Sequence, residues 1–418
     1  MRFALTLVLF IALLPRTLCA QDTLRLTRRQ ADSLFLKNNL LLLAERFRIE
    51  AAEAQVLQAS LYDNPIATAE VSLYNSQTRR VVDVGTEGQK YIAIQQLLYT
   101  AGKRNKRIAL AREAARLTGL ELLDLLRGLR YDLRSQFYKL YFGRLTLARY
   151  NQQIVTIQTT VEGYERQYER NNVSLRELLR LKALLFQLGN DRTEILFQMT
   201  DNERTLRTLL GTDQPIYTVV SDETLPRYQL PGLSDDSLRS MALQHRPDLL
   251  AAQSLTRQAE LNYTLQRALA QPDVRVGTVY DQNSNYIPNY LGMNLSMELP
   301  VFNRNQGAIR AARVQINYQQ GLARQRAVQI GSEVIAALAK IRAVESQVQS
   351  VEGRFSEQFD LLNQGVVTSF QKGNISLIEF VDLIETYNES VRELNRLRAD
   401  RVTAYEELNY LTGTDLFN

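Results

Sequence analysis

The longest hydrophobic pattern in the chain has the period of an α-helix. Between residues 104 and 168, large apolar side chains recur at steps of three and four, as in Leu122, Leu126, Leu129, Leu133, Phe137 and Leu140. This spacing forms one apolar stripe along a helix, as in coiled-coil packing. It predicts a single helix of about 65 residues, on the order of 100 Å at 1.5 Å per residue. The alternative is a bundle of shorter helices with breaks at the glycines at positions 119, 128, 143 and 163.

The distribution of proline agrees with long helices. No proline lies between Pro65 and Pro215, and none follows Pro300. Since proline in a helix interior costs about 3 kcal/mol, proline-free stretches of this length suit uninterrupted helices. The helical spacing continues in two further series, Leu178, Leu181, Leu185 and Leu188, and Leu377, Val381 and Ile384. We therefore predict additional helices there.

Four segments change to the two-residue alternation of β-strands. Residues 66–75 and 290–299 alternate clearly between apolar and polar, and residues 91–98 and 274–280 alternate less cleanly. The two clear runs are each about ten residues, the length of a transmembrane strand. Tyrosines near the strand ends are typical of interfacial aromatic girdles. The alternative is an ordinary half-buried hairpin in a soluble domain.

The chain repeats itself at a nearly constant offset. Three segments of the first half match three of the second: 38–65 with 245–272, 98–112 with 299–313, and 168–213 with 370–415. Each half therefore predicts the order helix, two strands, long helix, turn, helix. We expect a signal peptide over residues 1–20, a first repeat over 21–213, a connecting equatorial segment over 214–244 and a second repeat over 245–418.

The two predicted helical turns, at residues 170–172 and 372–374, carry the same capping signal. A serine follows each turn with a glutamate three positions later, as Ser174 with Glu177 and Ser376 with Glu379. This is the spacing of a capping box at a helix N-terminus. Glycines at positions 211 and 413 stand where a helix C-terminus favours them.

The start of the chain resembles a secretory signal. Arg2 supplies the positive charge, an apolar run follows, and Leu18-Cys19-Ala20 precedes the expected cleavage site. The alternative is lipoprotein processing at Cys19. After cleavage behind Ala20, the mature chain would contain no cysteine, which excludes a disulfide framework, a zinc knuckle and a thiol nucleophile.

Composition argues against an enzyme and against a nucleic-acid-binding protein. His245 is the single histidine of the chain, so a histidine-based metal site or a Ser-His-Asp triad would have to be built around it. The net charge is +5, with acidic and basic residues interspersed. We expect no catalytic residue, no metal site, no cofactor and no nucleic-acid partner.

Oligomerisation follows if the strands cross a membrane. After the signal, no run of 18 apolar residues remains, so a membrane protein with this sequence would span as strands. Four strands leave open edges, and each unpaired backbone group in lipid costs several kcal/mol. Two copies would give eight strands and too narrow a tunnel, so we expect three copies and twelve strands.

Taken in order, these features resemble the TolC-like family of outer-membrane efflux proteins over essentially the whole mature chain. The motifs are Ala-Ala-Glu-Ala at 51–54 within the helix 40–59, Gln-Leu-Leu-Tyr at 96–99 before Gly-Lys-Arg at 102–104, and Gly-Asn-Ile-Ser-Leu-Ile-Glu at 373–379. Residues 299–307 are similar to a segment common in the heavy-metal cation efflux branch. The resemblance implies a mainly α fold with β strands: a long periplasmic α-helical coiled-coil barrel, and four strands per protomer in a trimeric twelve-stranded transmembrane β-barrel.

The resemblance also implies a function. It predicts the outer-membrane channel of a tripartite efflux system in a Gram-negative bacterium, extending into the periplasm. The expected partners are two further copies, outer-membrane lipid, a periplasmic adaptor (membrane fusion) protein, and an inner-membrane pump of the RND type or an ABC transporter. Its cargo would be small molecules or metal cations. A type I protein secretion outlet and a non-channel periplasmic coiled-coil scaffold are the alternatives.

Family members constrict the periplasmic entrance with acidic residues just after the second turn. Glu379 and Asp382 match those positions, and three copies would form acidic rings that attract cations. In the first half Glu177 persists, whereas Arg180 replaces the aspartate and could face a neighbouring carboxylate in the closed state. The expected adaptor contacts are the turn residues Asn172, Val173, Ser174, Gly373, Asn374, Ile375 and Ser376. Simple helix capping is the alternative for both sets.

Overall fold

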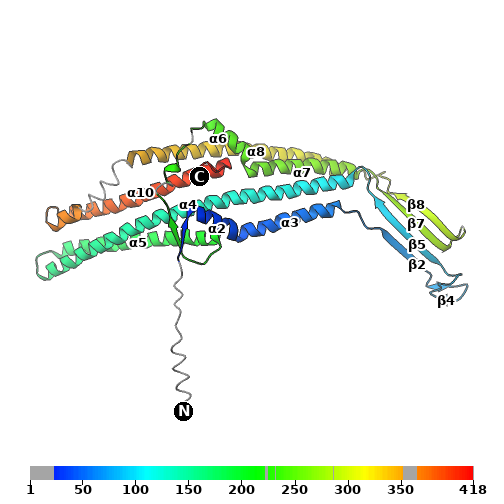
Figure 1. The fold of residues 1–418 in the computed structure, drawn as a ribbon, viewed down its shortest axis with the longest axis horizontal. Helices are drawn as coiled ribbons and strands as arrows, with labels where there is room; N and C mark the ends of the chain where they lie inside the picture. The colour runs from blue at the N-terminus through cyan, green and yellow to red at the C-terminus, as the bar shows by residue number, and fades with distance from the viewer. Residues whose placement is uncertain (1–22, 222–224, 231, 286, 352–364, 418) are drawn as a thin grey trace, which may run out of the picture. The chain divides into compact units, whose positions relative to one another are not determined.

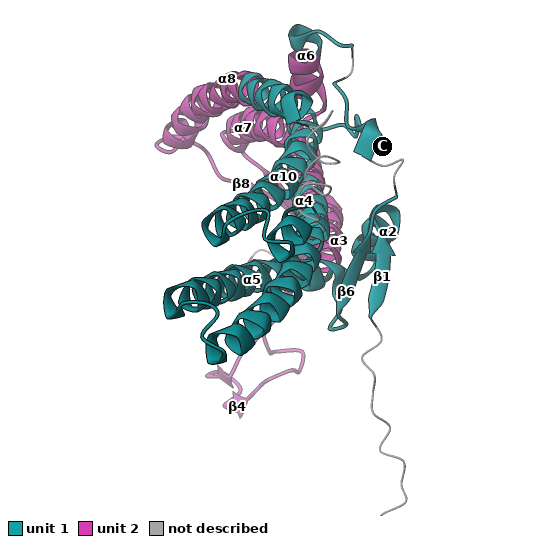
Figure 2. Cartoon of the chain, turned by 90° about the vertical axis from the view of Figure 1, so that its left-hand side faces the viewer, with its two compact units in different colours: residues 1–41, 127–237, 334–418 teal, residues 42–126, 238–333 magenta. Residues whose placement is uncertain are grey.

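The computed structural model describes residues 23–221, 225–230, 232–285, 287–351 and 365–417. The expected signal peptide and Cys19 lie outside these residues. The chain forms two compact units, and each takes segments from both halves of the sequence (Figure 2). The first unit comprises residues 1–41, 127–237 and 334–418, and the second comprises residues 42–126 and 238–333.

A four-stranded antiparallel sheet dominates the second unit (Figure 1). Its order is β2-β5-β7-β8, with β2 at Ile66–Val71, β5 at Lys90–Leu98, β7 at Val274–Asn283 and β8 at Pro288–Met297. All four predicted strands are present. The prediction of one strand over residues 66–75 was wrong at its end, because Tyr74–Asn75 (β3) pairs with Arg80–Val81 (β4) in a separate small hairpin. This hairpin folds around the buried Asp83 carboxylate, which accepts hydrogen bonds from Asn75 and Thr78.

The long helices match the helical pattern closely. α4 runs over Lys103–Glu169 and has 67 residues, so the glycines do not break it. α5 covers Leu175–Leu210, α8 covers Gln306–Val351 and α10 covers Leu377–Thr412. Leu133, Phe137 and Leu140 of the apolar stripe in α4 are buried. Their burial stabilises α4, because most helical stability in proteins comes from packing of an apolar face and not from intrinsic propensity.

Shorter helices precede the strands in each half. α3 at Leu40–Ser60 precedes β2, and α7 at Pro247–Leu269 precedes β7. The start of α7 is fixed by Arg246, whose fully buried guanidinium donates to Asp248 (2.7 Å) and to Glu333 of α8 (2.5 Å). Burial lowers the Arg246 pKa, but the hydrogen bonds to both carboxylates outweigh this and raise the pKa overall.

The sequence analysis missed a small parallel strand pair in the first unit. β1 at Leu24–Thr27 pairs with β6 at Ile216–Val219, and α2 at Arg28–Asn38 follows β1. The expected connecting segment also contains the short helix η1 at Leu225–Arg227 and the first ten residues of α6 at Asp235–His245. Each of these strands has only four residues, and almost two hundred positions separate them, so the sequence shows no periodic pattern for either strand. His245 is the last residue of α6.

Among the described residues, no helix contains a stretch that is both long enough and apolar enough to cross a membrane.

Candidate functional site

Two helical turns of the first unit have the same backbone conformation. In the first turn, the Asn172 amide donates to the Gln167 carbonyl oxygen (2.9 Å), and in the second the Asn374 amide donates to the Ser369 carbonyl oxygen (2.9 Å). Asn171 has φ +57° and Gly373 has φ +73° at the equivalent position. A left-handed residue followed by this six-to-one hydrogen bond is a Schellman ending, which satisfies the last carbonyl groups of the preceding helix. We call these turns the first and second helix tips (residues 170–174 and 372–376).

Each tip continues into a helix through a complete capping box, as predicted. The Ser174 side chain accepts from the Glu177 amide (3.3 Å), and Glu177 accepts from the Ser174 amide (2.7 Å). Ser376 and Glu379 repeat this arrangement with distances of 3.3 and 2.8 Å. Hydrogen bonds from the serine backbone amides lower the pKa of both glutamates. Both carboxylates therefore carry full negative charge at neutral pH.

The two tips are held together by one aromatic and aliphatic core. Phe370 stacks on Phe380 of α10 with ring centroids 4.1 Å apart, and on Tyr164 of α4 with centroids 5.8 Å apart. Phe380 is fully buried, and the same cluster includes Leu178 and Leu181 of α5. Hence the tips of the two helical hairpins, which are about 200 residues apart in sequence, form one structural element.

The four proposed gate residues lie at matching positions on this element. Glu177 and Arg180 stand one helical turn apart in α5, and Glu379 and Asp382 stand one turn apart in α10. Arg180, Glu379 and Asp382 are exposed, and Glu177 is half-buried by its capping contacts. The structure thus leaves three of these four side chains accessible beside the tips.

The seven proposed contact residues do not share one environment. Asn172, Ser174, Gly373, Asn374 and Ser376 are exposed, whereas Val173 and Ile375 are half-buried. Ile375 packs against the core of the tips. Its place in a capping turn gave no sign of this, because the spacing shows where a helix begins and not which way the preceding residue points.

An ion pair near the first tip escaped the sequence analysis. Lys182 of α5 contacts Glu165 of α4 across the hairpin at 2.6 Å, with both side chains roughly half exposed. It places a neutralised pair two residues along α5 from Arg180. Exposed pairs of this kind stabilise by about 0–1 kcal/mol, so its main effect is on local charge.

The sheet of the second unit has two chemically different faces. Because paired residues of antiparallel strands point to the same side, the register assigns each side chain to a face. One face is mainly apolar and carries Ala67, Ala69, Ile92, Ile94, Val276, Leu291, Met293, Leu295 and Met297. The other face carries Thr68, Glu70, Gln95, Arg275, Asn294 and Ser296. On the apolar face Leu291 and Met293 are 76% and 78% exposed, so this chain alone does not cover them.

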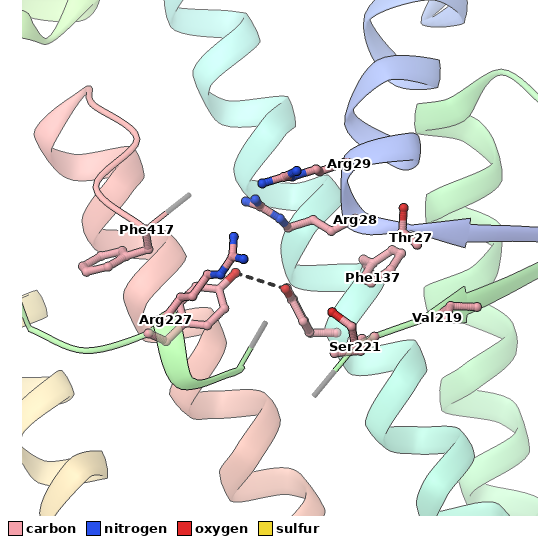
Figure 3. Close-up of a pocket in the computed structure, with 11 residues that line it drawn as sticks. Thr27, Arg28, Arg29, Phe137, Val219, Ser221, Arg227 and Phe417 are labelled. Carbon is pink, nitrogen blue, oxygen red and sulfur yellow. Dashed lines mark hydrogen bonds between the residues drawn. The ribbon is translucent and has the colours of Figure 1, made fainter. Parts of the chain in front are cut away.

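A pocket of about 250 Å³ lies in the first unit beside a buried polar network. In Figure 3 the ends of Arg28, Arg29 and Arg227 point into the same part of this pocket, with Phe137 and Phe417 on its walls. The neighbouring network contains Arg134, which forms buried or partly buried ion pairs with three carboxylates: Glu406 (3.0 Å), Asp32 (3.1 Å) and Asp415 (2.9 Å). Burial lowers the Arg134 pKa, but these carboxylates outweigh it and raise the pKa overall. The network joins α2, α4 and the end of α10.

Within the described ranges of the chain, no group of three or more His, Cys, Asp or Glu side chains has the arrangement of a metal site.

Part of the chain matches a known protein family, and nearly all of it matches solved structures. Residues 238–414 match the model of the outer membrane efflux protein family, and no curated protein matches the chain. A solved structure of CusC, described in connection with transmembrane channel formation, has a TM-score of 0.75 at 18% identity, covering 93% of this chain and 92% of that chain. The Campylobacter jejuni CmeC outer membrane channel gives 0.75 at 11% identity, with 92% and 85% covered. The open state of the Neisseria gonorrhoeae MtrE outer membrane channel gives 0.72 at 15% identity, with 93% and 89% covered.

At these identities the solved structures show a shared fold over nearly the whole chain, and the family model covers most of its second half. The expected resemblance is confirmed, and the family consists of channels and not of enzymes. Residues 238–414 are therefore similar to the outer membrane efflux protein family, and the chain shares its fold with the solved outer-membrane channels.

Proposed function

We propose that this chain is the outer-membrane channel of a tripartite efflux system, which exports small molecules or metal cations. It would receive them from an inner-membrane pump, of the RND type or an ABC transporter, through a periplasmic adaptor protein. The observation that carries the proposal is the four-stranded sheet, which exposes one apolar face and is continuous in sequence with the long helices. A soluble scaffold would not be expected to expose such an apolar face.

The sheet edges support assembly into a trimer. In the described part of the chain, β2 pairs only with β5 in this sheet and β8 pairs only with β7. Unpaired strand edges in lipid are costly, so a neighbouring copy would have to pair with each edge. Three copies would close a twelve-stranded barrel, with the apolar face toward lipid and the polar face toward the lumen.

The order of elements supports the proposed division into two repeats, 21–213 and 245–418, joined by the segment 214–244. The first half runs α3, β2, β5, α4, α5, and the second runs α7, β7, β8, α8, α10. In both halves the last helix starts at a capping box and ends at a left-handed glycine, Gly211 or Gly413.

For the helix tips we propose two roles. Glu379 and Asp382, with Glu177 and Arg180, would line the periplasmic entrance, where three copies would set a ring of charge. The exposed tip residues Asn172, Ser174, Gly373, Asn374 and Ser376, with Val173 and Ile375 as their apolar support, would contact the adaptor. The exposure of Arg180, Glu379 and Asp382 supports the first role.

Two measurements test this function. The mature protein, extracted from outer membranes in mild detergent, should have the mass of a trimer after correction for bound detergent. A stable monomer found only in the soluble periplasmic fraction would overturn the channel and favour a scaffold.

Planar-bilayer recordings test the gate. Glu379→Gln with Asp382→Asn should reduce the selectivity for cations over anions. Asp400→Asn, which removes an exposed carboxylate further along α10, serves as the matched control. Unchanged selectivity in the double variant would remove these two residues from the gate.

A further inference from the structure

The segment that joins β8 to α8 presents an unusually exposed apolar group. Phe302 is 92% exposed, Leu299 is 70% exposed and Val301 is 58% exposed. Transfer of such side chains out of water is favourable, and the chain alone does not gain this free energy. A covering partner would recover that free energy.

The exposure of Phe302 does not come from a loose loop. The Val301 amide donates to the Leu299 carbonyl oxygen at 2.8 Å. Just beyond it, the Asn305 side-chain amide donates to the Gln266 backbone carbonyl (2.8 Å) and side-chain oxygen (2.9 Å) in α7. A hydrogen-bonded turn thus precedes Phe302, and Asn305 fastens the segment to α7 just after it.

The apolar surface of this segment continues that of the sheet. β8 exposes Leu291, Met293, Leu295 and Met297 on the apolar face, and the exposed Leu299 follows two residues after the end of this strand. Since the proposed function places this face in lipid, the segment 299–304 would lie where the hydrocarbon ends and the headgroups begin. Aromatic side chains concentrate at that level in membrane proteins.

Arginines gather at the same end of the sheet. The residues before β2 and after β5 lie there too, because both strands meet the helices at this end. Arg104 lies over the ring of Tyr62 (4.3 Å to the centroid), and Arg107 lies over the ring of Tyr99 (4.5 Å). Arg304 adds an exposed guanidinium two residues after Phe302. Arginine is well suited to bind phosphate oxygens in pairs.

We propose that residues 299–304 form an anchor for anionic phospholipid at the periplasmic leaflet, with Phe302 inserted among the lipids and Arg304 at their phosphate groups. The inference rests on the proposed function, because it needs the sheet in a membrane. Continuity with the apolar face and the exposed guanidinium of Arg304 favour lipid over a second copy of the chain as the occupant of this surface.

The absence of tryptophan from the sequence gives a direct test. Three variants of the full chain, each with one tryptophan, are reconstituted in nanodiscs that contain brominated lipids, which quench nearby tryptophan. Phe302→Trp reports on the anchor, Met293→Trp on the apolar face of the sheet, and Phe186→Trp on an exposed site of α5. We expect blue-shifted, quenched emission from the first two variants and unquenched emission from the third.

Each outcome separates the anchor from the channel itself. Quenching of Met293→Trp without quenching of Phe302→Trp would overturn the anchor and leave the channel standing. A blue-shifted but unquenched Phe302→Trp would indicate that a second copy covers the site. Failure of lipid to quench Met293→Trp would instead contradict membrane insertion of the sheet, and with it the proposed function.

A second experiment tests whether the anchor requires anionic lipid. It compares quenching by brominated phosphatidylglycerol with quenching by brominated phosphatidylcholine, where each brominated lipid is added to nanodiscs of unbrominated phosphatidylcholine. Phe302→Trp should be quenched more strongly by phosphatidylglycerol. One Lys or Arg near an anionic surface is worth about 1 kcal/mol, so Arg304→Gln in this background should reduce the preference roughly fivefold. Arg324→Gln, an exposed position further along α8, should leave it unchanged. Equal quenching by both lipids in the parent variant would remove the requirement for anionic lipid.

Discussion

The paired helix tips depend on one buried aromatic ring, and removing it should release them. Phe380 is fully buried and stacks on Phe370 at 4.1 Å with an interplanar angle of 11°. Phe380→Ala removes the ring at the point where α10 packs against the other hairpin. The tip backbone would remain capped by Ser376 and Glu379, so the loss should be one of packing and not of helix formation.

The expected magnitude follows from burial and stacking. A buried Phe→Ala change costs about 3–5 kcal/mol, which includes the cavity that remains. If the tips open locally, amide exchange at residues 365–381 should accelerate roughly a hundredfold to a few thousandfold, since each 1.4 kcal/mol is a factor of ten. A double-mutant cycle with Phe370→Ala should show a coupling of about 0.5–1.5 kcal/mol from the stacked pair.

Hydrogen exchange with mass spectrometry on the detergent-solubilised protein measures this effect. Phe186→Ala is the matched control, because it truncates a ring that is 72% exposed in the chain. It should change the free energy of local opening at the second tip by no more than about 0.5 kcal/mol. Equal exchange in Phe380→Ala and the unmodified protein would refute the reasoning, because the core could not then be what holds the tips together.

Three further predictions concern caps, pH and the buried network. Gly211→Ala should lower the melting temperature, because Gly211 has φ +60° and a Cβ would meet the Asn38 carbonyl oxygen at 2.6 Å; the left-handed conformation alone costs about 1–2 kcal/mol. Gly163→Ala, in open space within α4, is the control and should stabilise by about 1 kcal/mol. Hydrogen bonds from Ser376 lower the pKa of Glu379 in the folded chain. The stabilisation from these hydrogen bonds is therefore complete above the pKa of Glu379 in the unfolded chain, about 4.3, and is lost as the pH falls through its pKa in the folded chain. Exchange in the first turn of α10 should therefore accelerate only in acid. Arg134→Met should destabilise the chain by about 3–5 kcal/mol in thermal or denaturant unfolding, because Glu406 would remain buried without its charge partner. A change below about 1 kcal/mol would show that the ion pairs of Arg134 do not stabilise this part of the fold.

The elements of this protein were readable from the sequence wherever their signals are local. The helix of α4 follows from an apolar stripe and the lack of proline, and both follow from the geometry of one helix. The capping boxes after both tips were predicted residue by residue, because a cap involves residues only three positions apart. The strands were found by alternation, although the end of the first was misplaced where the small hairpin folds around Asp83.

Tertiary structure alone decided which distant segments meet. No local pattern indicates that Phe370 stacks on Phe380 and Tyr164, or that Ile375 turns into the core while Asn374 stays outside. The sequence likewise did not reveal the parallel pairing of β1 with β6, the burial of Arg134 among three carboxylates, or the outward-facing Phe302. These features depend on the free energy of contacts between residues tens to hundreds of positions apart. Periodicity and capping constrain each helix and strand separately, and only the packed chain determines which of their side chains meet.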